Sequence, residues 1–599
     1  MSKNSNSYRM EVLFLAERKK QSLLSGAFVL VVSAVLVKVI GLLYKIPLTA
    51  LIGEVGRGYF SAAYNIFTPV YAVSMAGLPI AVSGMVSRNM ALGKYKQVKK
   101  TFRVALSMFA VTGIGGTALL LILAYPYSFW LIHSPETFKC IIAIAPSVFF
   151  CCIMSAYRAY YEGLGNMVPT AVSQVIEAVA KMALGIGFAY MVMKYGMREY
   201  AATGAVFGTP AADSQQAQSL LYPWTASAAI LGVSVGTVAG WLYLWIYKKI
   251  QGSIFTRTEL INSPLAQKSR ETAREMIAFS MPVMTGSIIL NITNFIDNVA
   301  VQNRLAAAVM RDTAVIKEMY GAALAASGTL DKDISVYLYG VYGAVMDFRS
   351  LVPTVTMTLG ISAIPIISAA WAVNNKRAVR RTVNSVIRTV MLVALPAGFA
   401  MAVLAEPLLS LIYGGTRTSN MVGIAAPMLA AYGFVTPIMA VSAPVTHMLQ
   451  AVGRTDVPVK SLLMGATVKI VADYILVGNP QINIYGAPVG SILNYTIVVF
   501  YELACLVAET GAMPDIKSVF LKPFFCALMS TLTAKMAFDN LGNVLSTPSA
   551  VNLFISIAAA VIVYFTLLLF IKGISGEDLR MLPKGEKIAK TLEKFGLLG

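Results

Sequence analysis

The chain is dominated by long apolar segments. Of its 599 residues, 57% are hydrophobic and only 13% are charged, a composition that excludes an ordinary soluble enzyme. A helix of about 20 apolar residues crosses the hydrocarbon core of a bilayer, and fourteen segments are long enough to be candidates. We therefore predict an all-α integral membrane protein with fourteen transmembrane helices. The expected spans are 24–50, 58–86, 104–126, 138–160, 168–193, 222–247, 276–302, 336–368, 384–410, 420–446, 458–477, 484–508, 518–538 and 550–571.

Basic residues between the spans indicate the orientation. With the N-terminus inside, the cytoplasmic loops and adjoining helix ends hold 33 of the 48 Lys and Arg residues, and the external ones hold nine. This is the bias that cytoplasmic loops carry. We expect a multi-pass protein with both termini in the cytoplasm. The net charge of +20 then reflects this bias and attraction to anionic membrane lipids, so nucleic acid is not an expected partner.

Two similar stretches indicate an internal repeat. Gly165–Lys181 and Gly453–Lys469 both begin with Gly, continue through Val-Pro and end on Lys, and their ends share an offset of 288. Because helices 1–6 and 7–12 both start inside, we expect two parallel six-helix lobes, followed by two C-terminal helices without counterparts. The expected parts are an N-terminal lobe at 1–247, an amphipathic cytoplasmic linker at 248–275, a C-terminal lobe at 276–509, and helices 13–14 with a cytoplasmic tail at 510–599.

One segment is similar to a known family. Tyr157–Glu177 reads YRAYYEGLGNMVPTAVSQVIE and resembles the multidrug/oligosaccharidyl-lipid/polysaccharide exporter superfamily, in the branch of stage V sporulation protein B and the lipid II flippases. The resemblance implies two lobes around a central cavity, alternating access, and a groove for an isoprenoid tail at the last two helices. It also implies transport in a bacterial cytoplasmic membrane, in peptidoglycan synthesis or sporulation.

Six basic residues are assigned to the spans: Lys38, Lys45, Lys181, Arg349, Lys469 and Lys535. A cation in the bilayer core is costly unless it faces water or a partner. Lys38 and Lys45 lie on one face of helix 1, with no acidic residue at helical spacing. This favours a water-filled cavity that accepts an anion, although Lys45 could instead extend to the outer interface.

The repeated lysines have acidic neighbours. Glu177 precedes Lys181 by one turn, and Asp473 follows Lys469 by one turn, so each can form an i,i+4 pair. Two interpretations stay open. The pairs neutralise charge, or the lysines bind cargo, since Lys and Arg hold phosphate oxygens by charge-assisted bonds.

Further candidates lie in helix 8 and in the first external loop. Arg349 and Asp347 are two residues apart and face different ways, so they cannot neutralise each other. Arg349 is therefore a further candidate, beside Lys38, for binding the pyrophosphate group of a lipid-linked cargo. Arg57 could gate the outer mouth or be a solvated loop residue. Four acidic residues are possible charge partners or coupling groups: Glu177, Asp297, Asp347 and Asp473.

The sequence favours a flippase for a polyprenyl-pyrophosphate-linked saccharide, and the family resemblance alone implies a peptidoglycan precursor as cargo. A cation-coupled multidrug antiporter of the same superfamily is the main alternative, but helices 1 and 10 contain no Asp or Glu to bind a cationic drug. A polyprenyl-dependent glycosyltransferase would need an acidic or metal-binding constellation, which the loops do not offer. We expect a secondary transporter that works as a monomer without catalytic residues, metal or cofactor, with a coupling ion of unknown identity.

Overall fold

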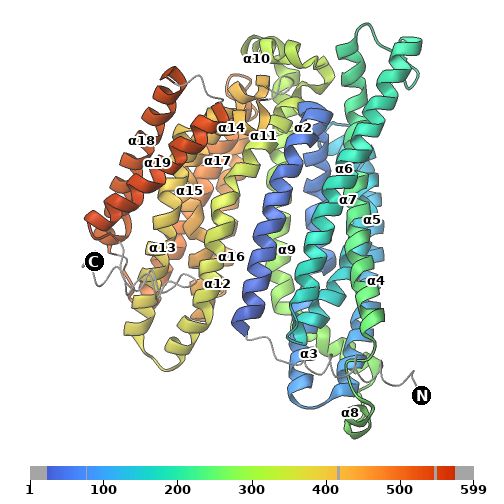
Figure 1. Cartoon of the computed structure of the whole chain (residues 1–599), viewed down its shortest axis with the longest axis vertical. Helices are drawn as coiled ribbons and strands as arrows, with labels where there is room; N and C mark the ends of the chain where they lie inside the picture. The colour runs from blue at the N-terminus through green and yellow to red at the C-terminus, as the bar shows by residue number, and fades with distance from the viewer. Residues whose placement is uncertain (1–22, 76, 415–418, 514, 545–548, 574–599) are drawn as a thin grey trace. The chain divides into compact units, whose positions relative to one another are not determined.

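The computed structural model describes residues 23–75, 77–414, 419–513, 515–544 and 549–573. This part is almost entirely helical (Figure 1), and its strands are the two-residue β1 (Ala205–Val206) and β2 (Thr209–Pro210), paired antiparallel. The all-α prediction is confirmed; the expected C-terminal tail lies outside the described residues. The helices are α2 (Leu23–Met75), α3 (Leu78–Ala91), α4 (Tyr95–Pro126), α5 (Thr137–Gly163), α6 (Val168–Thr203), α7 (Ser214–Gln251), α8 (Arg257–Asn262), α9 (Ser269–Arg311), α10 (Thr313–Ser327), α11 (Ile334–Arg349), α12 (Leu351–Ala372), α13 (Lys376–Val403), α14 (Ala405–Tyr413), α15 (Ser419–Ala451), α16 (Asp456–Leu476), α17 (Gly486–Thr510), α18 (Lys522–Val544) and α19 (Ser549–Phe570).

Within the described residues, ten helical runs are long and apolar enough to cross a membrane. They contain eleven of the fourteen expected spans, because the run Val32–Ala91 includes two of them. The other three expected spans are also helical: they fall on α9, on α11 with α12, and on α16. Charged residues make α16 less apolar, since Lys460, Lys469 and Asp473 lie within it. The membrane-protein architecture is confirmed, and the count of fourteen stays a prediction.

The first external loop, expected between residues 50 and 58, is absent as a loop. Helix α2 continues through it and is interrupted only at Gly53, with φ 64° and ψ −178°. Side chains with a Cβ avoid this left-handed φ, whereas glycine adopts it without a steric penalty. The interruption is therefore a kink of one residue.

Two other expected connections are more ordered than the sequence indicated. The external segment 303–335 contains α10. The amphipathic linker expected at 248–275 contains the end of α7, the six-residue α8 and the start of α9. A capping box between Thr256 and Glu259 starts α8, and Pro264 follows its end. Lys96 Nζ donates to the Ser263 carbonyl at 2.9 Å, which anchors this segment to α4.

The chain forms two compact units. The first unit comprises the residues up to Ile52 and Tyr59–Phe295, and the second comprises Gly53–Gly58 and the residues from Ile296 onward. In the first unit, α6 packs along α7, and α5 packs on α4 and α7. In the second, α15 packs on α12, α13 and α17, α16 packs on α17, and α18 packs on α19. The four-part division made from the sequence stays a prediction.

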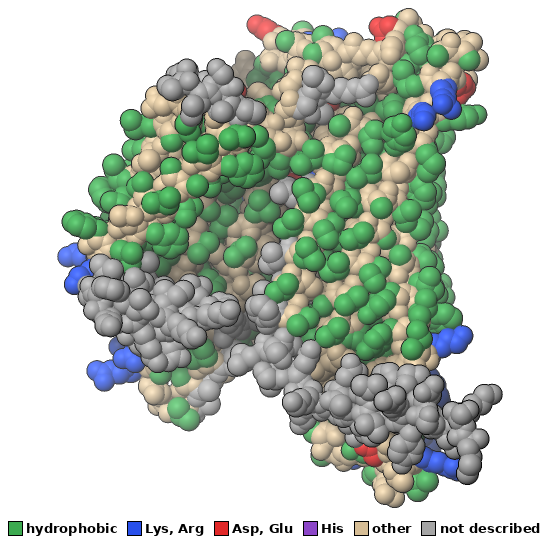
Figure 2. Space-filling model, in the orientation of Figure 1, with side chains coloured by type: hydrophobic (Ala, Val, Ile, Leu, Met, Phe, Trp, Pro, Cys, Tyr) green, Lys and Arg blue, Asp and Glu red, His purple; other side chains and the backbone are tan. Residues whose placement is uncertain are grey.

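Exposed helix faces are strongly apolar. Figure 2 shows hydrophobic side chains over the middle of the helices and charged side chains near the helix ends. On α4, Val111 and Ile122 are each 71% exposed, and on α19 Ile562 is 66% exposed. A soluble monomer does not expose apolar surface on this scale, so these faces suit contact with lipid.

Candidate functional site

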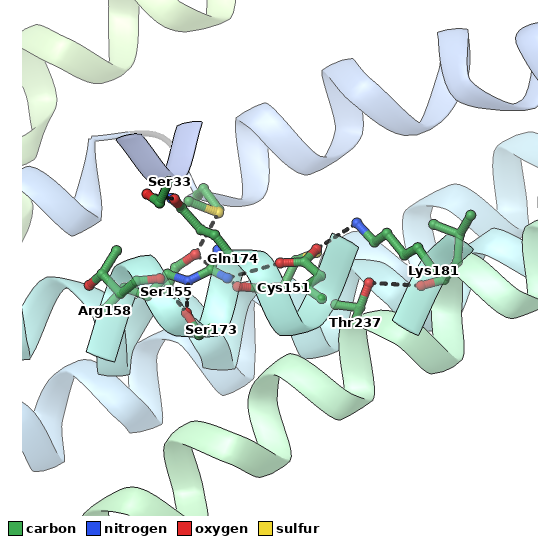
Figure 3. Close-up of polar contacts among 12 residues, drawn as sticks. Ser33, Cys151, Ser155, Arg158, Ser173, Gln174, Lys181 and Thr237 are labelled. Atoms are coloured by element: carbon green, nitrogen blue, oxygen red, sulfur yellow. Dashed lines mark hydrogen bonds and ion pairs between the residues drawn. The ribbon is translucent and has the colours of Figure 1, made fainter. Parts of the chain in front are cut away.

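One carboxylate holds two cations in the first unit (Figure 3). Lys181 Nζ on α6 donates to Glu177 Oε1 at 2.5 Å, which confirms the expected pairing. Arg158 Nη2 on α5 donates to the second oxygen, Glu177 Oε2, at 2.9 Å, and Arg158 Nε donates to Ser173 Oγ at 2.9 Å. With one anion and two cations, this cluster carries a net charge of +1.

Contacts between α2 and α6 fix the height of Lys38 relative to this cluster. Ser33 Oγ donates to Gln174 Oε1 at 3.1 Å, over a separation of 141 residues. Tyr44 packs on Gly185, where an added Cβ would lie 2.5 Å from Tyr44 Oη, and this pair has the same separation. The two helices therefore run parallel, with residue 38 level with residue 179. At about 1.5 Å per residue, Lys38 lies within about 3 Å, along the helix axis, of both Glu177 and Lys181.

This cationic level, defined as Lys38, Arg158, Lys181 and Glu177, has three cations for one anion. Lys38 is exposed, and it has no hydrogen bond or ion pair with the part of the chain that the structure describes. The side chain of Lys181 is 29% exposed, compared with 12% for Glu177. Both ammonium groups can therefore accept an anionic ligand. Lys45, two turns beyond Lys38, is partly buried and has an interaction partner of its own.

The repeated lysine of the second unit has the opposite environment. Lys469 Nζ on α16 donates to Asp473 Oδ2 at 2.5 Å, as expected, and also to Asp297 Oδ1 on α9. Its side chain is only 5% exposed. Two anions and one cation give this cluster a net charge of −1, and the ammonium is fully engaged.

Arg349 lies among tyrosines in the second unit. Its guanidinium lies 5.1 Å from the ring centroid of Tyr432 and 5.5 Å from that of Tyr495, and it donates to Tyr495 Oη at 3.2 Å. No carboxylate among the described residues pairs with it. Asp347 faces elsewhere, as the sequence predicts, and pairs with Arg57.

Arg57 is buried, which corrects the interpretation of it as a solvated loop residue. It is 6% exposed, forms an ion pair with Asp347, and lies 5.2 Å from the ring centroid of Tyr413. The reason is the kink at Gly53, which leaves Arg57 within α2 rather than in a loop. Its role as an outer gate stays a prediction.

Sequence reasoning missed Arg158 and the two tyrosines beside Arg349, Tyr432 and Tyr495. Arg158 was counted with a cytoplasmic loop, because it lies two residues before the expected end of a span at 160. The structure continues α5 to Gly163, so Arg158 lies more than one turn before the helix end. Its position within the segment that carries the family resemblance was the available signal.

Two family models match the chain. Residues 23–212 match the polysaccharide biosynthesis protein family, and residues 339–475 match the MatE family. The chain is 25% identical over 567 residues to stage V sporulation protein B of Bacillus subtilis (strain 168), covering 94% of this chain and 98% of the relative. It is 22% identical over 501 residues to the lipid II flippase MurJ of the same strain, covering 82% and 83%.

Solved structures share the fold. An inward-facing multidrug resistance MATE family transporter of the MOP superfamily aligns with a TM-score of 0.58 at 12% identity, covering 80% of this chain and 98% of that one. The lipid II flippase MurJ in an inward closed conformation aligns with a TM-score of 0.55 at 15% identity, covering 91% and 98%. With family-model matches in both halves and relatives that align over most of its length, this chain is a multi-pass membrane protein that is similar to these transporters and flippases.

Proposed function

We propose that this chain is a flippase that moves a polyprenyl-pyrophosphate-linked saccharide across the bacterial cytoplasmic membrane by alternating access. A lipid-linked peptidoglycan precursor is the favoured cargo. In this proposal the protein is a secondary transporter rather than an enzyme, works as a monomer without a cofactor, and has both termini in the cytoplasm.

The cationic level of the first unit carries the proposal. Lys38 and Lys181 lie within about 3 Å of each other along the helix axis. Arg158 pairs with the Glu177 oxygen that Lys181 does not contact. The cationic level has three cations and one anion, and a pyrophosphate with several negative oxygens supplies the anionic charge that balances them. Its binding therefore removes the cost of unpaired cations inside the membrane. Arg349, which lacks a carboxylate partner among the described residues, is the proposed contact in the second unit.

The relatives support the same class of cargo. One is named a lipid II flippase, and another is named a stage V sporulation protein. Both align over more than four fifths of this chain. Cargo with a lipid tail and an anionic head group agrees with the excess of cations beside apolar, lipid-facing helices.

A multidrug exporter is the second candidate, because a MATE family transporter aligns with a TM-score of 0.58. Its cationic substrates require carboxylates that are free to bind them. Here Glu177 is shared by two cations, and like-charge repulsion from Lys38 and Lys181 opposes a cationic drug. The flippase proposal therefore agrees better with the charges of the first unit.

Reconstituted vesicles test the proposal. The full chain is placed in liposomes with a fluorescent polyprenyl-pyrophosphate disaccharide, and an impermeant quencher reports the fraction that reaches the outer leaflet. We expect transport that is lost in Lys38→Ala and kept in Lys535→Ala. Lys535 is a suitable control because it is an exposed lysine, paired with Asp539 on α18.

Two further probes separate the candidates. The same polyprenol without its pyrophosphate should not be transported faster than in empty vesicles, and a cationic dye should not be exported. Export of the dye without transport of the pyrophosphate lipid would replace the flippase proposal with the multidrug one.

A further inference from the structure

The charges around Lys469 leave one carboxylate oxygen without a partner. Asp473 is 0% exposed, and its Oδ2 accepts a hydrogen bond from Lys469 Nζ. Its Oδ1 has no hydrogen-bond partner among the residues that the structure describes. The oxygen lies against Gly490 on α17, where an added Cβ would be 2.1 Å away. A buried, unpaired carboxylate oxygen is unfavourable, and here it belongs to a cluster that already has one negative charge in excess.

Other ionisable groups near Asp473 come from neighbouring helices. Asp297 of α9 shares Lys469 with it. Tyr432 of α15 interacts electrostatically with Lys469 and with Arg349, and Tyr342 of α11 interacts with Arg349 and Asp297. On α17, Tyr495 contacts Arg349, and Gly490 contributes no side chain.

Arg349 is thus the distant counter-charge of this network. The two carboxylates and Lys469 sum to −1, and Arg349 brings the total to zero. The guanidinium does not touch either carboxylate; the ring of Tyr432 lies 5.1 Å from it, and the Tyr432 hydroxyl contacts those of Tyr342 and Ser491 at 3.4 and 3.0 Å. A ligand that neutralises Arg349 would leave the buried carboxylates uncompensated.

We propose that Asp473 takes up a proton from water on Oδ1 when an anionic head group binds Arg349, and releases it when the head group leaves. This inference rests on the proposed function, because it takes the pyrophosphate as the ligand of Arg349. Binding of the proton and of the anion then favour each other, as linkage between two sites requires. Asp473 acts as the coupling residue, and Lys469 holds its carboxylate in place.

Infrared titration of the full chain in lipid nanodiscs measures the proton directly. The carbonyl stretch of a protonated carboxylic acid is recorded while the pH is lowered, first without ligand. We expect a band in the wild type that is lost in Asp473→Asn. Arg349→Gln should move its midpoint to higher pH by on the order of one unit, since the positive charge of Arg349 favours the ionised form of a carboxylate in the same network. Adding polyprenyl pyrophosphate to the wild type should move the midpoint in the same direction.

A matched control lies on the same helix. Asp456 on α16 is exposed, and hydrogen bonds from Arg454 and Lys460 lower its pKa to about 2. Asp456→Asn removes the same group, but it should leave the band and its midpoint unchanged.

Each result has one meaning. A spectrum that is identical in wild type and Asp473→Asn overturns the proton site. The proton site is also overturned if the carboxylic-acid band never forms because a metal cation occupies the cluster. A band that is present but insensitive to Arg349→Gln overturns the coupling. If the ligand-free titration behaves as expected and polyprenyl pyrophosphate does not bind, the proton site stands and the proposed cargo fails.

Discussion

Lys181 and Lys469 occupy matching positions in the sequence repeat, and their charge environments are opposite. Lys181 shares one carboxylate with Arg158, whereas Lys469 is shared by Asp297 and Asp473. The first arrangement leaves an ammonium that is 29% exposed and a positive excess, and the second buries the ammonium in a negative excess. The two repeats therefore suit different tasks: anion binding in the first unit and charge compensation in the second.

Replacing Lys181 separates cargo binding from stability. Because Arg158 still pairs with Glu177 in Lys181→Met, the carboxylate keeps a partner, and we expect near wild-type abundance and melting temperature with transport reduced tenfold or more. Glu177→Gln leaves two cations unpaired, and loss of a buried partner typically costs about 3–5 kcal/mol. Abundance, thermal unfolding in detergent and vesicle transport measure these effects.

The double variant Glu177→Gln with Lys181→Met removes both charges together. If Lys181 only neutralises Glu177, this protein should transport at the wild-type rate. Because Arg158 then loses its carboxylate partner, we expect reduced abundance, and transport is measured per inserted protein. On that measure we expect the double variant to be inactive. The equivalent pair in the second unit, Lys469→Met with Asp473→Asn, leaves Asp297 unpaired, so we expect reduced abundance there.

The head-group contacts are tested at Lys38 and Arg349. Lys38→Ala and Arg349→Ala should abolish transport while leaving membrane insertion largely intact. Neither residue has an ion-pair partner among the described residues, so neither substitution leaves a carboxylate without its cation. Arg349→Lys should keep part of the rate if only charge matters, and little if two oxygens are held at once. Full transport by both alanine variants contradicts the assignment.

The i,i+4 pairs could be predicted from the sequence, and the remaining charges of the clusters could not. Lys181 and Glu177 are one turn apart on a single helix, so local geometry alone brings them together. Arg158 and Asp297 reach the clusters from other helices, 19 and 172 residues away along the chain. Their approach depends on helix packing, which apolar periodicity does not encode. Similarly, the height of Lys38 depends on the contacts of Ser33 and Tyr44 with α6.

The ends of the helices test the predicted orientation. In a cysteine-free background, Lys94→Cys in the basic segment 88–103 should be shielded from an impermeant thiol reagent in whole cells, as should cysteines at 370–382. Ala326→Cys and cysteines at 200–215 should react, because these positions are expected outside. Lys94 and Ala326 are both exposed in the structure, so a difference in labelling reports the side of the membrane rather than burial. Labelling of Lys94→Cys from outside would reverse the orientation.

The ion pair between Arg57 and Asp347 is the proposed outer gate, and it must open during each cycle. Arg57 is 6% exposed, so Arg57→Ala should leave the Asp347 carboxylate without its cation, although Tyr413 Oη still donates to it at 3.4 Å. Loss of a buried ion-pair partner typically costs about 3–5 kcal/mol. The exchanged variant, Arg57→Asp with Asp347→Arg, restores opposite charges and should recover much of the stability. A reducible bifunctional thiol reagent that joins cysteines at 57 and 347 separates gating from stability, because it spans the length of the two side chains and holds this contact closed without an ion pair. We expect crosslinked protein that is folded but does not transport, with transport regained on reduction. Transport at the wild-type rate with the crosslink intact would show that this contact does not open, and Arg57 would then be a structural partner of Asp347.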